Sequence, residues 1–103
     1  MPDADVFDAI ASPVRREILD LLRQGERPVH DLAACFAITR PAVSQHLRVL
    51  RAAGLVSEER VGRERRYRLD ARPLRAVLDW TAHYEQFWQH HARLLSELLE
   101  EAD

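Results

Sequence analysis

The spacing of apolar residues along the chain predicts a mainly helical fold with one β-hairpin. In five segments apolar side chains recur every three or four residues, which is the pattern of a helix with one buried face. Prolines stand at or next to the start of four of these segments, where a missing N–H does no harm. The predicted helices are a short one around Val6, Phe7 and Ile10, followed by residues 13–24, 28–36, 40–53 and 73–101.

Two hydroxyl residues mark helix starts in this pattern. Ser12 and Thr39 stand directly before two of the predicted helices, where a side-chain oxygen can accept an N–H of the first turn. Only residues 37–39 separate the helix 28–36 from the helix 40–53. Such a short connection between two helices is typical of a helix-turn-helix motif.

The stretch 55–70 has the features of a hairpin. Residues 55–60 and 65–69 contain β-branched and aromatic side chains, and they flank Gly62, which suits a turn. Four helices, a hairpin and a final helix, in that order, predict a winged helix-turn-helix fold. We expect a single domain over residues 1–103, with the hairpin as its wing.

Charge is distributed unevenly along the chain. The net charge is −2, and all 15 basic residues are arginine. Residues 40–68 carry a net charge of +5, whereas residues 1–39 carry −3 and residues 69–103 carry −4. A basic stretch between acidic flanks is typical of a surface that meets a polyanion, although a solvated basic surface would have the same composition.

The predicted recognition helix, residues 39–53, has polar side chains opposite its apolar stripe of Val43, Leu47 and Leu50. The polar side carries groups that bond base edges, because Gln pairs with adenine, Arg with guanine, and Ser or Thr with either. The candidate DNA-binding residues of this helix are Thr39, Arg40, Pro41, Ser44, Gln45 and Arg48. By itself the pattern also fits an ordinary solvated surface, and the preceding turn and the basic hairpin favour DNA.

His46 lies at the edge of the apolar stripe, about 60° from its centre when each residue advances about 100°. We expect this side chain to form a bond across a helix junction. A contact with a DNA phosphate is the alternative.

Arginine dominates the tip of the hairpin, where Arg60, Arg63, Arg65 and Arg66 lie close together. Like charges at this density repel one another, so we expect the tip to meet phosphates or a minor groove beside the recognition helix. Side chains alternate along a strand, and not all of these arginines can face the DNA. Arg63 and Arg65 are the candidate contacts.

The chain resembles the ArsR family of winged-helix repressors over about residues 5–70. The resemblance lies in ASPVRREILDLL, VHDLA and TRPAVSQHLRVLRAAGLVSEERVGRERRYRL. It implies a dimeric repressor that binds an inverted-repeat operator in double-stranded DNA and dissociates when an effector binds. The positions that match the DNA-contacting residues of the family are Arg40, Pro41, Ser44 and Gln45, of which Pro41 can offer only an apolar contact.

The metal-binding motifs of the family are absent from this sequence. Residues 28–33 read PVHDLA where arsenic-sensing members carry three cysteines, and the last helix lacks the histidine and carboxylate pairs of zinc-sensing members. We therefore expect no metal or other cofactor, and we expect Cys35 to be a buried, inert thiol. The alternative is a metal- or thiol-responsive sensor on the same scaffold, with ligands drawn from His83, His90, His91 and Cys35.

The last predicted helix, residues 73–101, carries more apolar surface than one small domain can bury. We expect one face to cover the domain's own core, which leaves further aromatic side chains exposed in a monomer. A homodimer through the first and last helices would bury them and place two recognition helices about 34–36 Å apart. The candidate interface residues are Val6, Phe7, Trp80, Tyr84, Phe87, Trp88 and Leu95. The alternative is a monomer whose long helix completes the core.

Several function classes do not fit the sequence. No apolar run reaches the roughly 20 residues that span a bilayer, and the start MPDADVFDAI lacks the regions of a signal peptide. We therefore expect no membrane partner and a cytoplasmic location. Nothing in the sequence indicates an enzyme, since it offers no nucleophile with a base and no phosphate-binding glycine loop. A winged-helix module that binds a protein instead of DNA is a further alternative.

Overall fold

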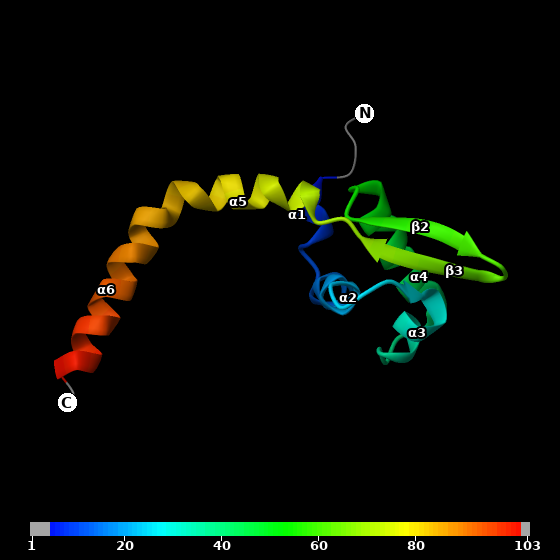
Figure 1. The fold of residues 1–103 in the computed structure, drawn as a ribbon, viewed down its shortest axis with the longest axis horizontal. Coiled ribbons are helices and arrows are strands. Elements are labelled where there is room, and N and C mark those ends of the chain that lie inside the picture. The colour runs from blue at the N-terminus through cyan, green and yellow to red at the C-terminus, as the bar shows by residue number, and fades with distance from the viewer. Residues whose placement is uncertain (1–4, 102–103) are drawn as a thin grey trace.

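The computed structural model describes residues 5–101 and is mainly helical with a small three-stranded sheet (Figure 1). The elements are α1 (Val6–Ala9), α2 (Pro13–Leu22), β1 (Arg27–Pro28), α3 (Val29–Ala34), α4 (Arg40–Ala52), β2 (Val56–Val61), β3 (Glu64–Leu69), η1 (Arg72–Leu74), α5 (Arg75–Thr81), η2 (Ala82–Tyr84) and α6 (Glu85–Glu101). The predicted order of four helices, a hairpin and a C-terminal helical segment is confirmed. Residues 1–4 and 102–103 of the predicted domain 1–103, including the start of MPDADVFDAI, lie outside the described residues. Every helix of the described residues is too short or too polar to cross a membrane.

The helices begin where the hydroxyl residues predict. Ser12 Oγ accepts a hydrogen bond from the backbone N–H of Arg15 at 3.3 Å, and Thr39 Oγ1 accepts one from the N–H of Ala42 at 3.2 Å. Each bond satisfies a donor that the first turn of α2 or α4 would otherwise leave unpaired. The predicted recognition segment 39–53 is therefore a polar cap followed by α4.

The core forms where α2, α3 and α4 meet the inner side of the hairpin. The largest fully buried side chains are Ile18, Leu32, Val43, Leu47, Leu50 and Leu55. Three of them form the apolar stripe predicted for α4, and Tyr67 of β3 joins the core from the sheet. Burial of each large side chain contributes about 1.5–3 kcal/mol relative to its exposure, so this stripe holds α4 in one orientation.

The sheet contains a strand that the apolar pattern does not predict. Arg27 and Pro28 form β1, which pairs antiparallel with β3 and places Arg27 opposite Tyr67 and Pro28 opposite Arg66. A proline restricts the residue before it to extended backbone, which suits pairing at a sheet edge. Helix α3 consequently begins at Val29, one residue later than expected.

The C-terminal segment contradicts the single helix predicted for residues 73–101. It begins with the 3-10 turn η1, and the second 3-10 turn, η2, separates α5 from α6 where the chain bends (Figure 1). Just before η2 the hydroxyl of Thr81 donates to the carbonyl of Leu78 at 2.9 Å. Back-bonding of this kind bends helices, and it accounts for a bend in a stretch without proline or glycine.

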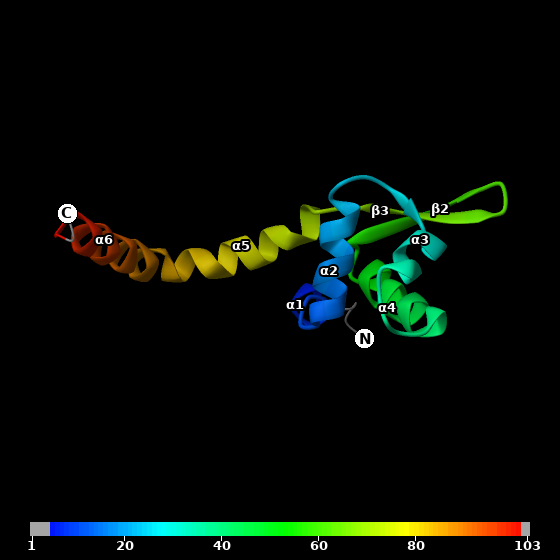
Figure 2. The ribbon, with the colours of Figure 1, turned by 90° about the horizontal axis from the view of Figure 1, so that it is seen from below.

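The expectation that this segment covers the core is also wrong. Leu74 packs against the core, but no side chain of α5 or α6 is buried. Figures 1 and 2 show α6 extending away from the body, at the opposite end of the molecule from the hairpin. Because α6 extends beyond the body of the domain, the apolar side chains of α5 and α6 are not covered by the rest of the described chain.

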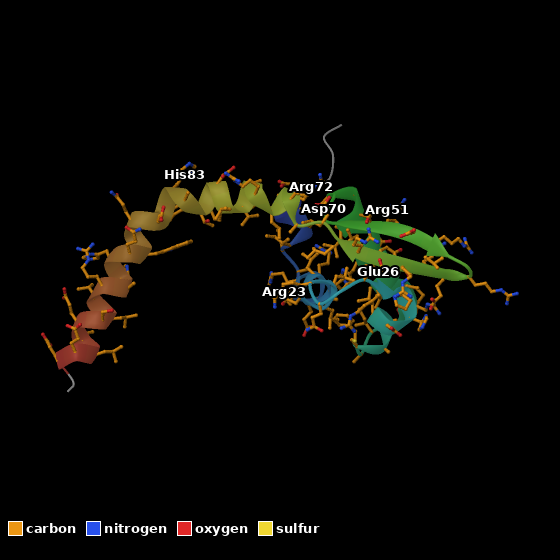
Figure 3. All side chains as sticks on the ribbon, in the orientation of Figure 1. Arg23, Glu26, Arg51, Asp70, Arg72 and His83 are labelled. Carbon is orange, nitrogen blue, oxygen red and sulfur yellow. The ribbon has the colours of Figure 1, made fainter. Side chains whose placement is uncertain are left out.

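An ion pair marks the point where β3 leads into the C-terminal segment. A guanidinium nitrogen of Arg72 lies 2.7 Å from Oδ2 of Asp70, and the backbone N–H of Arg72 donates to Oδ1 at 3.1 Å (Figure 3). These bonds, the side-chain bond first, lower the pKa of Asp70 to about 2. The ionised carboxylate thus helps to set the direction in which η1 leaves the sheet.

Candidate nucleic-acid interface

Helix α4 turns one side away from the core, as predicted. The exposed residues on and next to that side are Thr39, Arg40, Pro41, Gln45 and Arg48. Ser44 is half-buried and lines the space between α4 and the hairpin. All six candidate residues therefore lie at the surface. Two of them, Arg40 and Pro41, belong to the first turn of α4.

The side chains of Gln45 and Arg48 are hydrogen-bonded to each other. A guanidinium N–H of Arg48 donates to Oε1 of Gln45 at 2.8 Å. Within residues 5–101 the amide nitrogen of Gln45 makes no hydrogen bond, so it can donate to an acceptor at the surface. The bond limits the directions in which Gln45 can point.

Two polar cavities lie between α4 and the hairpin. The larger, of about 290 Å³, is lined by Val29, His30, Arg40, Ser44, Arg60, Arg63, Glu64 and Arg65. The smaller, of about 100 Å³, is lined by Ser44, Arg48, Arg51, Glu58, Arg65 and Tyr67. Ser44 and Arg65 line both cavities, so the fold brings the predicted helix residues and the predicted wing residues to one basic surface.

The pairing of β2 with β3 decides which arginines of the hairpin share this surface. Arg60 lies directly opposite Arg65, and Glu58 lies opposite Tyr67, so these four form the α4-facing side of the hairpin. Gly62, at φ 63°, opens the two-residue turn, and Arg63 occupies its second position.

Arg66 and Arg68, together with Glu59, lie on the other side, called here the outer side of the hairpin. The expectation that the arginines of the tip cannot all face one way is thus confirmed.

Carboxylates pair with the arginines of the outer side. Glu26, in the loop before β1, lies 3.2 Å from Arg66 and 2.9 Å from Arg68. Bonds to Arg68 and then the charges of both arginines lower the pKa of Glu26. On the α4-facing side, Arg40, Arg60 and Arg63 form no ion pair with any carboxylate of residues 5–101. Among the arginines of the hairpin, those without a carboxylate partner in residues 5–101 therefore lie next to α4.

The structure adds two arginines that the sequence pattern did not single out as contacts. Arg60 shares the α4-facing side with Arg65, and Arg51 of α4 lines the smaller cavity beside Arg48. A two-residue turn at Gly62 sets a register that pairs Arg60 with Arg65. That turn was therefore a signal from which Arg60 could have been found.

His46 has the structural role predicted for it. Its Nδ1 lies 3.1 Å from a guanidinium nitrogen of Arg15, which joins α4 to α2. The same guanidinium donates to the backbone carbonyls of Ala9 at 2.6 Å and Asp8 at 3.1 Å, at the end of α1. Burial, and then the charge of Arg15, lower the pKa of His46. This junction links α4 to α2 and to the end of α1.

The residues named for an alternative sensor do not converge. His91 Nδ1 lies 2.9 Å from the Phe87 carbonyl, and the described part of the chain contains no group of three side chains placed to hold a metal ion. Cys35 is exposed, contrary to the expectation of a buried thiol, and its sulfur donates to the Asp31 carbonyl at 3.4 Å. The reason is that α3 ends at Ala34, so Cys35 lies just beyond the buried stripe.

The candidate interface residues lie on α1, α5, η2 and α6, and most of them are exposed. Trp80, Tyr84, Phe87, Trp88 and Leu95 are about half exposed or more, and Phe7 is 37% exposed. The rings of Phe7 and Trp80 meet edge-on with centroids 5.8 Å apart, which joins α1 to α5. Val6 differs from the others because it is half-buried against the core.

A helix-turn-helix whose second helix has a free polar side, followed by a basic hairpin, defines a winged helix-turn-helix protein. Residues 12–58 match the bacterial regulatory protein family arsR. The chain is 46% identical over 80 residues to the transcriptional repressor SmtB of Mycobacterium tuberculosis, and the match covers 77% of this chain and 59% of SmtB. It is 38% identical over 80 residues to the transcriptional repressor SdpR of Bacillus subtilis, covering 78% of this chain and 89% of SdpR.

Solved structures agree with these similarities. A crystal structure of a possible transcriptional regulator for arsenical resistance is 41% identical with a TM-score of 0.68, and the match covers 94% of this chain and 97% of that one. A homodimeric winged helix-turn-helix DNA-binding domain from Mycobacterium bovis is 34% identical with a TM-score of 0.63, covering 77% and 76% of the two chains. The chain therefore belongs to the ArsR family, whose members are transcriptional regulators and not enzymes.

Proposed function

We propose that this chain is a homodimeric transcriptional repressor that binds an inverted-repeat operator in double-stranded DNA. The observation that carries the proposal is the basic surface where Arg40 and Arg48 of α4 each line a cavity together with Arg65 of the wing. SmtB and SdpR are both repressors, which supports repression as the outcome of binding. Since the operator of a bacterial repressor lies in the cytoplasm, this role implies a cytoplasmic location.

In this proposal α4 enters the major groove with its N-terminal half toward the bases. The groove admits one helix, and Gln45 and Arg40 carry the groups that bond adenine and guanine edges. Thr39 suits a phosphate contact because it caps α4, where N–H groups and the helix dipole favour anions. Ser44 lies in the second turn, and its hydroxyl can bond a phosphate or a base. Arg60, Arg63 and Arg65 of the wing would bind flanking phosphates or an adjacent minor groove.

Dimer formation would use the apolar surface of α1, α5 and α6. Phe7, Trp80 and Trp88 stay exposed in a single chain, and burial of one such side chain contributes about 1.5–3 kcal/mol. The homodimeric relative from Mycobacterium bovis supports the formation of a dimer. A twofold axis would set the two α4 helices about one turn of DNA apart, about 34–36 Å, and would match an inverted repeat.

The test is selection of bound duplexes from a random DNA library with the full chain. The expected result is an enriched inverted repeat whose half-site centres lie about 10–10.5 base pairs apart. The affinity for it should fall linearly in log–log form as salt rises, because arginines displace counterions from phosphates. Absence of any enriched sequence would contradict the proposal and favour a module that binds protein.

The same selection distinguishes the sensor alternative. Repeating it with added zinc, and with an oxidant, shows whether either one releases the operator. A zinc response that disappears in a His83→Ala, His91→Ala double variant would indicate a metal sensor. The same operator affinity with and without zinc or oxidant would indicate that neither is the effector.

A further inference from the structure

Glu58 places a carboxylate inside the basic surface between α4 and the wing. Its Oε2 accepts a hydrogen bond from Arg51 of α4 at 2.6 Å, and its Oε1 lies 3.5 Å from Nε of Arg65 on β3. The side chain of Glu58 is 19% exposed, whereas those of Arg51 and Arg65 are 59% and 57% exposed. The acid therefore lies beneath two guanidinium groups that reach the solvent.

This arrangement ties the recognition helix to the wing. Arg51 comes from α4 and Arg65 from β3, and Glu58 is the one acidic side chain that lines the smaller cavity. The carboxylate accepts a hydrogen bond from Arg51 and forms a longer ion pair with Arg65, so it favours one direction for each guanidinium group. Each arginine keeps further N–H donors, which remain free for a phosphate.

The charge of Glu58 also has an effect of its own. Without it, Arg48, Arg51 and Arg65 would form a cluster of positive charge with no internal counter-charge. Such a cluster attracts the phosphate backbone of any duplex, because phosphate attraction does not depend on sequence. The carboxylate therefore weakens binding to all duplexes and at the same time holds the arginines in one geometry, which only a correctly docked duplex can use.

We propose that Glu58 is a positioning and specificity-determining residue, which orients Arg51 and Arg65 toward two backbone phosphates of the operator and limits binding to other DNA. The proposal rests on the DNA-binding function proposed above. It adds a residue whose negative charge repels the DNA backbone but which raises the ratio of operator affinity to non-operator affinity.

Glu59 provides a matched control for the charge. It is the next residue of the same strand, lies on the outer side, is 66% exposed and stands 3.8 Å from Arg68. Glu58→Gln and Glu59→Gln remove the same charge from opposite sides of the hairpin. Any general effect of net charge must appear in both variants.

The experiment measures the dissociation constants of wild type and both variants for the selected operator and for a scrambled duplex over a series of salt concentrations. Glu58→Gln should bind the scrambled duplex more tightly and reduce the ratio of operator to scrambled affinity by about fivefold or more. Glu59→Gln should leave that ratio at the wild-type value. Equal ratios in the two variants would overturn the proposal for Glu58, while a wild-type protein without operator preference would overturn the DNA-reading function itself.

The Glu58→Asp variant separates the effect of positioning from the effect of charge. It also tests the proposal if the Glu58→Gln variant does not fold. Asp keeps the negative charge but shortens the reach to Arg51 and Arg65. This variant should bind the operator more weakly and the scrambled duplex as the wild type does. Wild-type affinity for both duplexes would contradict the positioning role.

Discussion

Nδ1 of His46 accepts a hydrogen bond from the Arg15 guanidinium, which joins the proposed recognition helix to α2 at 3.1 Å. Arginine has donors only, so this nitrogen must carry a free lone pair and the imidazole must be neutral. Protonation of His46 would replace the bond by repulsion between two cations. The polar contact between α4 and α2 thus depends on the ionisation of His46.

The stability of the protein should therefore fall in mild acid. The pKa of His46 in the folded chain lies below its ordinary value of 6.5, so the unfolded chain takes up this proton first as the pH falls. The free energy of unfolding should be highest above about pH 6.5 and should decrease below it, down to the folded pKa. His46→Gln keeps an acceptor for Arg15 without a titrating ring, and its unfolding free energy should depend less on pH.

Chemical denaturation at a series of pH values measures this effect. His83→Gln, on the exposed η2 turn, is the matched control and should follow the wild-type curve (Figure 3). A His46→Gln variant with the full wild-type dependence on pH would show that another group is responsible.

Gln45→Ala should reduce discrimination between DNA sequences more than it reduces affinity in general. One bidentate contact to a base is worth about 1–3 kcal/mol of discrimination, and the bond from Arg48 holds Gln45 ready for such a contact. Binding assays with the operator and with a random duplex measure both quantities. Equal losses on the two duplexes would exclude Gln45 as a base reader.

Arg63→Ala and Arg65→Ala should weaken binding to every duplex and lower the slope of log affinity against log salt by about one each, since each removes one phosphate contact. Arg68→Ala is the control, because it removes the same charge from the outer side, where Glu26 pairs with it. Its salt slope should stay close to that of the wild type. If all three slopes match the wild type, the wing does not contact DNA.

Trp88→Ala should shift the protein from dimer to monomer and lower operator affinity as a result. Trp88 is 53% exposed in the single chain, and aromatic residues at the centre of an interface often contribute about 2 kcal/mol or more to binding. Sedimentation velocity over a range of protein concentrations measures the equilibrium. Gln89→Ala changes the neighbouring residue of α6 and should remain as dimeric as the wild type; a dimeric Trp88→Ala variant would place the interface elsewhere.

Those parts of the fold that depend on neighbours in sequence were predictable. The caps at Ser12 and Thr39 and the inward stripe of Val43, Leu47 and Leu50 follow from periodicity and local hydrogen bonding. The candidate side of α4 followed from the same stripe, because a helix that buries one side must expose the other. The family resemblance over about residues 5–70 was confirmed by the match of residues 12–58.

Features that depend on how separate elements pack were not predictable from the pattern. Strand β1 has only two residues, which is too short for a hydrophobic pattern to be detected. It forms because its backbone can pair with the edge of β3. The pairing of Glu58 with Arg51 and Arg65 depends on how closely the hairpin packs on α4. The contacts of Glu26 with Arg66 and Arg68 span about 40 residues of sequence.

The sequence by itself determined the first four helices, the caps at Ser12 and Thr39, the helix-turn-helix spacing and the side of α4 that faces outward, because each of these depends on interactions between residues a few positions apart. Only the tertiary structure decided which arginines share a surface with α4, which are paired with carboxylates, and that α6 leaves the body with its apolar side uncovered. These features depend on strand register and on the packing of whole elements. No short stretch of sequence contains that information.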